Sequence, residues 1–272
     1  MQGADTTTQD LADLALLDTT ARAAGKVALA FFGKDPQVWM KQGASPVTEA
    51  DFAVNHYLHD TLRPARPDYG WLSEESEDNE ARLVAERLFV VDPIDGTRGF
   101  MAGSEDWTIS VAVVDRKADR HGRQVWRPSS AALFNPCRDE MYLAQQDGGA
   151  FLNGTRIAAT RETEIAGARF SISKPMYRSL ELEQLGVIRT RHIPSLAYRL
   201  ALVASGQVSA AIARPNAHDW DLAAADLLVH EAGGLLWGEN GAPISYNSQI
   251  PRHGVLFASG EPLGSLLLAL IR

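Results

Sequence analysis

The chain has 272 residues, of which 45% are hydrophobic and 22% are charged, and these fractions are typical of a globular protein. Its formal net charge of −8 argues against a nucleic-acid backbone as the main partner, but it does not exclude a small anionic substrate beside bound metal ions. The single cysteine, Cys137, cannot form an internal disulfide, and neither a signal peptide nor an apolar run of membrane-spanning length is evident. We therefore expect a cytoplasmic protein with no membrane partner.

The first part of the sequence predicts two helices. Apolar residues recur at helical spacing over 8–32, and Gly33 suits the end of that helix. A polar loop is expected over 41–46, followed by a second helix over 51–62 that ends before Pro64.

The remaining elements change in character at about residue 160. Before it the pattern favours short strands, and the basic stretch 116–127 is interpreted as a solvated hairpin loop. The expected strands there are 88–91, 107–114, 130–134, 140–144 and 150–152. After it strands and helices alternate, with strands over 168–173, 188–193, 208–213, 235–237 and 255–257 and helices over 177–185, 196–204 and 221–232.

This order predicts a layered α/β protein. We expect a single domain over residues 1–272, with an antiparallel α+β half of about 1–160 and an α/β half of about 161–272. No flexible linker is evident between the halves, so they are expected to pack as one unit.

The segment Asp92-Pro93-Ile94-Asp95-Gly96-Thr97 follows an apolar strand and carries two acidic residues three positions apart. Two carboxylates held close together repel each other unless a cation lies between them, and oxygen ligands favour Mg²⁺. A helix is expected to begin near Gly96 and Thr97, where free backbone N–H groups suit a phosphate. The alternative is an ordinary turn, in which Asp and Gly are common.

Three further acidic residues have suitable positions, and two of them have a simpler interpretation. Glu74 ends a predicted short strand, while Asp51 and Asp221 each begin a predicted helix. A carboxylate at a helix start also caps the free N–H groups. Asp219 offers a second possible cap, which would leave Asp221 available for a ligand.

Taken together, these segments resemble the inositol monophosphatase-like family of Mg²⁺-dependent, lithium-sensitive phosphatases. The resemblance follows the family's order along nearly the whole chain and is closest to the bacterial 3′(2′),5′-bisphosphate nucleotidases. The matching segments are Pro46-Val47-Thr48-Glu49-Ala50-Asp51, Ser73-Glu74-Glu75-Ser76, Asp92-Pro93-Ile94-Asp95-Gly96-Thr97, Trp220-Asp221-Leu222-Ala223-Ala224-Ala225 and Glu231-Ala232-Gly233-Gly234.

The resemblance implies an αβαβα sugar-phosphatase sandwich, a homodimer, and two or three Mg²⁺ ions. It assigns the metal ions to Glu74, Asp92, the carbonyl of Ile94, Asp95 and Asp221. It assigns the phosphate to the amides of Gly96 and Thr97, and the orientation and deprotonation of the attacking water to Asp51 with Thr97. Lys41 matches a family lysine near the site, with a spacing that differs by one residue.

The substrate is less sharply defined than the chemistry. Arg214 stands seven positions before Asp221, where the resemblance places a substrate-binding residue, and a guanidinium suits a second phosphate. We therefore favour adenosine 3′,5′-bisphosphate, with an inositol, sugar or histidinol phosphate as the alternative. Arg214 is otherwise a surface residue after a strand. A role mainly as a macromolecular binding partner is a third hypothesis.

Overall fold

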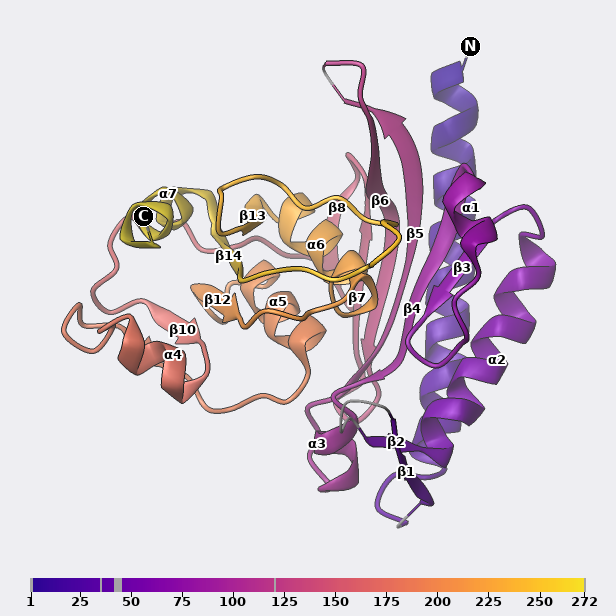
Figure 1. Ribbon diagram of the computed structural model, residues 1–272, viewed down its shortest axis with the longest axis horizontal. Coiled ribbons are helices and arrows are strands. Elements are labelled where there is room, and N and C mark those ends of the chain that lie inside the picture. The colour runs from indigo at the N-terminus through magenta and orange to yellow at the C-terminus, as the bar shows by residue number, and fades with distance from the viewer. Residues whose placement is uncertain (1, 35, 42–45, 120, 272) are drawn as a thin grey trace.

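The computed structural model describes residues 2–34, 36–41, 46–119 and 121–271, and these residues form alternating layers of helices and sheets (Figure 1). Helices α1 (Gln2–Leu29) and α2 (Glu49–Ala65) cover one face of a large sheet. Helices α5 (Leu196–Ala204) and α6 (Asp219–Glu231) lie between that sheet and a smaller one.

The outer layer completes the sandwich. Helices α4 (Lys174–Ser179) and α7 (Glu261–Ile271) lie on the far side of the smaller sheet, with which Met176 and Leu263 share a hydrophobic cluster. The order of layers is therefore helix, sheet, helix, sheet, helix, which confirms the predicted αβαβα arrangement.

The large sheet has seven strands in the order β3-β4-β5-β6-β7-β8-β9 within the described residues. Its strands are β3 (Gly70–Ser73), β4 (Arg87–Asp95), β5 (Thr108–Ala118), β6 (Gln124–Asn135), β7 (Glu140–Gln145), β8 (Gly149–Leu152) and β9 (Thr155–Arg156). Only the β3–β4 pair is parallel in this part of the chain, and the other neighbours are antiparallel. Sequence neighbours thus pair in space, as the alternating segments predict.

The smaller sheet is mixed, with the order β11-β10-β12-β14-β13 among the described strands. Its strands are β10 (Arg169–Ser171), β11 (Ile188–Arg189), β12 (Ala210–Ala213), β13 (Gly234–Gly238) and β14 (Leu256–Gly260). Strand β10 is parallel to both of its neighbours, whereas β14 is antiparallel to its own. The shorter elements are β1 (Val38–Met40), β2 (Pro46–Thr48), a 3-10 turn (Glu80–Val84) and α3 (Thr97–Met101).

One hydrophobic cluster joins the two halves of the chain. It contains Leu133 from the large sheet, Leu200 and Leu228 from the middle helices, and Leu256 from the smaller sheet. A second cluster lies beneath α1 and α2, where Leu17 and Leu58 are fully buried. The middle helices are therefore apolar on two sides, because each side faces a sheet.

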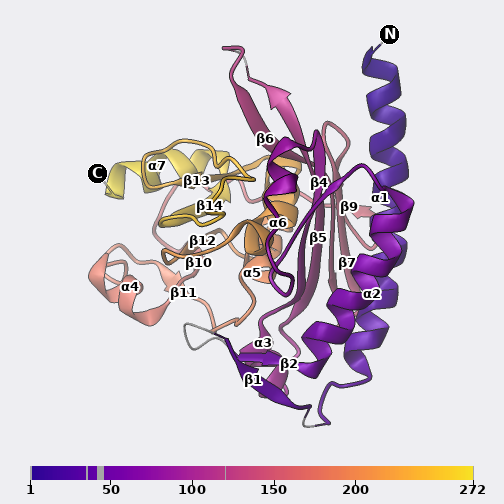
Figure 2. The same ribbon diagram turned by 45° about the vertical axis from the view of Figure 1, so that its right-hand side comes forward.

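Several predicted elements are wrong in extent. The expected hairpin loop over 116–127 is mostly strand, because β5 and β6 continue as a twisted ribbon that extends past the sheet (Figure 2). Polar side chains are compatible with a strand there because its faces are solvated. The expected helix over 177–185 is the shorter α4, and the polar loop over 41–46 lies outside the described residues at 42–45.

Gly233 follows the C-cap of α6 in the left-handed conformation, with φ of 80°, as predicted. Gly33 is also left-handed, with φ of 72°, but α1 ends at Leu29, before the predicted end at residue 32. No helix among the described residues is long and apolar enough to span a bilayer.

Gly25 sets how closely α1 approaches β6. A Cβ at this position would lie 2.7 Å from Cε1 of Phe134 and 2.9 Å from Cγ of Pro136. Replacing Gly by Ala in a helix ordinarily adds about 0.5–1 kcal/mol of stability. We expect Gly25→Ala to lower the free energy of unfolding by about 1–3 kcal/mol, because overpacking outweighs that gain.

Urea denaturation monitored by circular dichroism measures this change. Gly254→Ala is the matched control, since its Cβ would meet no atom closer than Oε1 of Glu239 at 3.9 Å. Unchanged or increased stability of Gly25→Ala would contradict the close packing of α1 on the sheet.

Candidate metal and phosphate site

The end of β4 places two acidic side chains at the boundary between the layers. Asp92 and Asp95 are 1% and 6% exposed, and the pairing of β4 with β5 shifts register between them. Gly96 follows with φ of 99°, in the left-handed region that favours glycine, and is the N-cap of α3. The local sequence thus ends a buried strand in a tight turn, as predicted.

Asp221 joins these two residues from the start of α6. One carboxylate oxygen of each of Asp92, Asp95 and Asp221 lies within 4.8 Å of the others. We call this group the acidic cluster. Its geometry and its all-oxygen donor set fit a hard divalent cation such as Mg²⁺.

Each member of the acidic cluster also accepts a backbone N–H. Asp92 Oδ1 accepts from the amide of Ile94 at 3.1 Å, and Asp221 Oδ2 accepts from the amide of His218 at 2.7 Å. Asp95 Oδ2 accepts from the amide of Ala197 at 2.6 Å. These bonds hold the three carboxylates in place.

The capping alternatives for Asp221 are resolved by these bonds. His218 is the N-cap of α6, and Asp221 completes its capping box. Asp219 is not the cap, because its carboxylate accepts from the amide of Asn247 and contacts Nε2 of His253, both at 2.7 Å. Asp221 therefore caps the helix and belongs to the acidic cluster at once.

Ser195 is a site residue that the sequence does not predict, and it binds Asp95 from 100 residues away. Its hydroxyl donates to Asp95 Oδ2 at 2.5 Å, and it is the N-cap of α5. The only signal was a serine before an apolar helical run, which indicates a cap but not what the cap contacts. The packing is close, since a Cβ on Gly96 would lie 3.2 Å from Cβ of Ser195.

Asp51 and Thr97 meet as the resemblance implies. The Thr97 hydroxyl lies 3.2 Å from Asp51 Oδ1 and 3.2 Å from the carbonyl oxygen of Ile94. Asp51 Oδ2 accepts from the amide and the hydroxyl of Thr48, at 2.7 and 2.6 Å. Asp51 thus caps α2 with one oxygen and holds Thr97 with the other, and burial raises its pKa.

Lys41 reaches the edge of the site despite its displaced spacing. Its Nζ lies 3.0 Å from Oε1 of Glu74 and 2.5 Å from Oε1 of Glu75. Burial lowers the pKa of Lys41, but these carboxylates outweigh burial and raise it above its usual value. Glu74 follows β3, and its amide donates to the carbonyl of Val91 on β4 at 3.2 Å.

The carboxylates near this turn carry a large electrostatic cost. Burial, together with the charges of Glu74 and the neighbouring aspartates, raises the pKa of Asp92 and of Asp221 well above the usual range. Burial raises the pKa of Asp95 to about 6 and, with the charge of Glu74, that of Glu75 to about 7. A divalent cation at the acidic cluster would relieve this repulsion.

Arg214 is not a member of the acidic cluster and lines a small pocket. This pocket, of about 120 Å³, runs between the end of β10, the segment before α5, and the end of β12. Its lining residues include Ser171, Ser173, Pro194, Arg199 and Arg214. Arg214 is exposed, so the structure is compatible with a substrate-binding residue and with a surface arginine.

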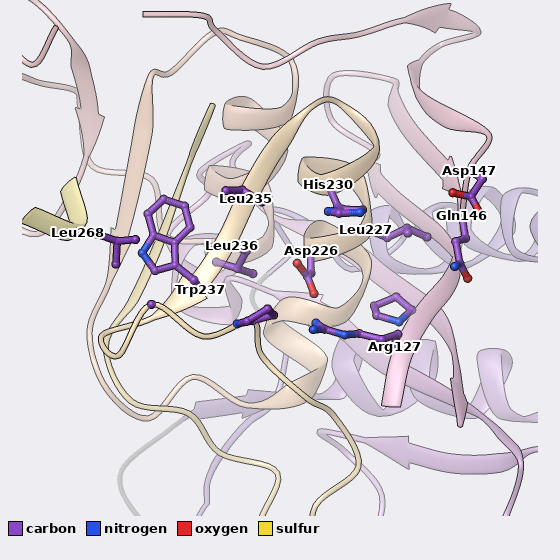
Figure 3. Close-up of a pocket in the computed structure, with 13 residues that line it drawn as sticks. Arg127, Gln146, Asp147, Asp226, Leu227, His230, Leu235, Leu236, Trp237 and Leu268 are labelled. Carbon is purple, nitrogen blue, oxygen red and sulfur yellow. The ribbon is translucent and has the colours of Figure 1, made fainter. Parts of the chain in front are cut away.

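A larger pocket of about 360 Å³ contains none of the predicted site residues (Figure 3). It lies between α6 and β13, and Asp226, His230 and Trp237 line it. The Asp226 carboxylate there accepts from the Tyr246 hydroxyl at 2.8 Å. The larger pocket therefore has no part in the acidic cluster.

The profile of the inositol monophosphatase family matches residues 11–270. The chain therefore belongs to the inositol monophosphatase family, whose phosphatases depend on metal ions. It is 35% identical over 238 residues to an inositol-1-monophosphatase of Rhizobium meliloti, covering 82% of this chain and 85% of that protein. It is 30% identical over 233 residues to the Nus factor SuhB of Xylella fastidiosa, covering 82% and 80%.

A solved structure shares the fold. The extragenic suppressor protein suhB of Bartonella henselae superposes with a TM-score of 0.82 at 27% identity, over 96% of this chain and 98% of that one. The layered fold and the family expected from the sequence are both confirmed.

The raised pKa values predict how stability depends on pH and metal. Asp95 binds protons more tightly in the folded state, with a pKa of about 6 against an ordinary value of 3.8. Between these values the folded state holds more protons, so the free energy of unfolding of metal-free protein falls as pH rises. We expect Asp95→Asn to reduce this fall. We expect Mg²⁺ to raise the melting temperature more at pH 8 than at pH 5.

Thermal melts in chelator and in excess Mg²⁺ at both pH values measure the effect, which amounts to about 2.7 kcal/mol when the ion is at ~100 times its Kd. Asp226→Asn is the matched control, because Asp226 is a buried aspartate outside the acidic cluster. Its Mg²⁺ response should equal that of the wild type. A Mg²⁺ response that Asp95→Asn leaves intact would contradict a cation site at Asp95.

Proposed function

We propose that this protein is a Mg²⁺-dependent phosphate monoester hydrolase that uses an activated water. The acidic cluster of Asp92, Asp95 and Asp221 carries the proposal, because its oxygens converge on one point beside a turn that presents backbone amides. When bound there, Mg²⁺ would neutralise phosphate oxygens, lower the pKa of a bound water and stabilise the leaving alkoxide.

The proposed metal ligands are those implied by the resemblance. Asp92, Asp95 and Asp221 form the convergent group, and we propose Glu74 and the carbonyl of Ile94 as the further ligands. Lys41 pairs with Glu74 and holds it in place. Two or three ions remain part of the proposal, as does inhibition by Li⁺.

The chain's own groups supply binding and proton transfer. The amides of Gly96 and Thr97, at the start of α3, would donate to the phosphate. Asp51 accepts a hydrogen bond from the Thr97 hydroxyl. This pair is suited to orient a water molecule and to take a proton from that water. No covalent intermediate is required.

The names of the relatives support inositol 1-phosphate as the first substrate to test. This reverses the order expected from the sequence, in which adenosine 3′,5′-bisphosphate came first. The nucleotide stays a second candidate, because Arg214 lines a pocket together with Pro194 and Arg199. A histidinol-phosphatase of Chlorobaculum parvum is also similar, at 29% identity over 266 residues.

Phosphate release in Mg²⁺ tests the proposal, with inositol 1-phosphate and adenosine 3′,5′-bisphosphate compared at matched concentrations. We expect Asp95→Asn to lower kcat/KM at least ~100-fold, since even groups behind a metal ligand are worth 10- to 100-fold. Glu86→Gln, at an exposed residue that precedes β4 at the end opposite to Asp95, should retain activity. Retained turnover in Asp95→Asn would contradict the proposed site.

Absence of turnover on every phosphate ester tested would favour a role as a macromolecular binding partner. The relatives named Nus factor SuhB give that reading its support. We further propose a homodimer and a single functional domain, which sedimentation and limited proteolysis would test.

Thr97 offers a separate test of the water-positioning pair. We expect Thr97→Val to lower kcat by about 10²-fold, because a positioned base contributes that much or more. Thr97→Ser keeps the hydroxyl near Asp51 Oδ1 and should recover most of the rate. If Thr97→Val and wild type had equal kcat, the hydroxyl would have no part in the reaction.

A further inference from the structure

Two buried polar atoms in the small pocket beside the acidic cluster lack hydrogen-bond partners. They are Nε of Arg199 and Oγ of Ser173, and both residues line the same pocket of about 120 Å³. An unsatisfied buried polar group costs stability, so such groups in native proteins call for an explanation. Here the pocket gives both atoms space for a ligand atom, with room for more than one water.

Ser173 is at the start of a helix, where a serine hydroxyl ordinarily bonds to the backbone. It is the N-cap of α4, a position at which a serine side chain usually accepts a backbone N–H. No such bond forms at this cap. The hydroxyl is therefore available to the pocket rather than to the helix.

Helix α5 directs Arg199 toward the site. Arg199 lies four positions after Ser195, so both side chains are on one face of the helix. Ser195 already binds Asp95 on that face. The charges of Asp95 and Asp221 raise the pKa of the Arg199 guanidinium and that of Arg214 lowers it, so Arg199 lies within electrostatic reach of both the acidic cluster and Arg214.

The third arginine of the pocket, Arg191, differs from Arg199 and Arg214 because its guanidinium forms an ion pair. Arg191 is held by Asp106, with Nη2 at 2.8 Å from Oδ1. Within the described part of the chain, no ion pair involves Arg199 or Arg214. Burial lowers the pKa of Arg199, and an anion in the pocket would offset that cost.

We propose that Arg199, with Arg214 and Ser173, forms a subsite for a second anionic group of the substrate, and that Arg199 selects for substrates that carry it. This inference rests on the proposed phosphatase function, which supplies the first phosphate site. The guanidinium fork suits a phosphate bound through two oxygens, and Ser173 adds a hydroxyl donor. The substrate class is a small phosphate monoester with a second phosphate.

Two nucleotides that differ only in the second group test this subsite. They are adenosine 3′,5′-bisphosphate and adenosine 3′-monophosphate. We expect Arg199→Gln to raise KM for the bisphosphate at least ~10-fold, as the loss of a charged hydrogen bond predicts. KM for the monophosphate should change less than ~2-fold, and kcat little for either.

Conservative variants separate selection from a structural role. Arg199→Lys keeps the charge and should recover part of the affinity, and Ser173→Ala should give a smaller loss confined to the bisphosphate. Arg123→Gln, in the exposed hairpin between β5 and β6, is the control for removal of a positive charge. Equal losses on both nucleotides, or no loss on either, would overturn the subsite.

The subsite can also be tested without turnover. If the wild type hydrolysed neither nucleotide, the proposed function would fail on these substrates, but the subsite would still be open to measurement. Titration calorimetry with adenosine 5′-monophosphate, which carries only the second phosphate, would then decide. Weaker binding by Arg199→Gln and by Arg199→Lys supports the subsite, and equal binding by all three proteins overturns it.

Discussion

Repulsion among three carboxylates, two buried and one half-buried, that meet at one point is the constraint on which the rest of this structure depends. The three carboxylates belong to Asp92 and Asp95 at a strand end and to Asp221 at a helix start. Each negative charge is destabilised by the loss of water and by the other two charges. The fold holds them together by giving every carboxylate a backbone N–H donor, from Ile94, Ala197 and His218. The positive ends of α5 and α6 contribute to the same balance.

The layered architecture brings these N–H donors together, because they belong to different layers. The end of β4 belongs to the large sheet, whereas α5 and α6 form the layer between the sheets. Both middle helices therefore begin at the same edge of the molecule as the end of β4. Two glycines permit the approach, because a Cβ on Gly99 would lie 2.7 Å from Cγ of Pro194 and one on Gly96 would crowd Ser195. The site therefore lies where the large sheet meets the layer of middle helices.

Local sequence was enough to predict the parts of the site that local geometry creates. The turn at Asp92–Gly96 follows directly from an apolar strand that ends in proline and glycine, and the layered fold follows from the order of elements. Ser195 could not be predicted, because its bond to Asp95 joins segments 100 residues apart. Arg199 could not be predicted either, because Ser173 and Arg214, which share its pocket, lie on other elements. The stretch 116–127 was misjudged because polarity reports exposure, and an exposed ribbon is as polar as a loop.

For Asp51 and Asp221, stabilising a helix start and belonging to the site are not alternatives. Asp51 uses Oδ2 at the start of α2 and Oδ1 for the Thr97 hydroxyl. Asp221 accepts the His218 amide at the start of α6 and also belongs to the acidic cluster. Asparagine could still accept the N-cap amide but would lose the charge, whereas glutamate would keep the charge but shift both oxygens by a methylene. Either kind of substitution would therefore disturb the helix start or the site, so the register of α2 and of α6 is tied to the geometry of the site.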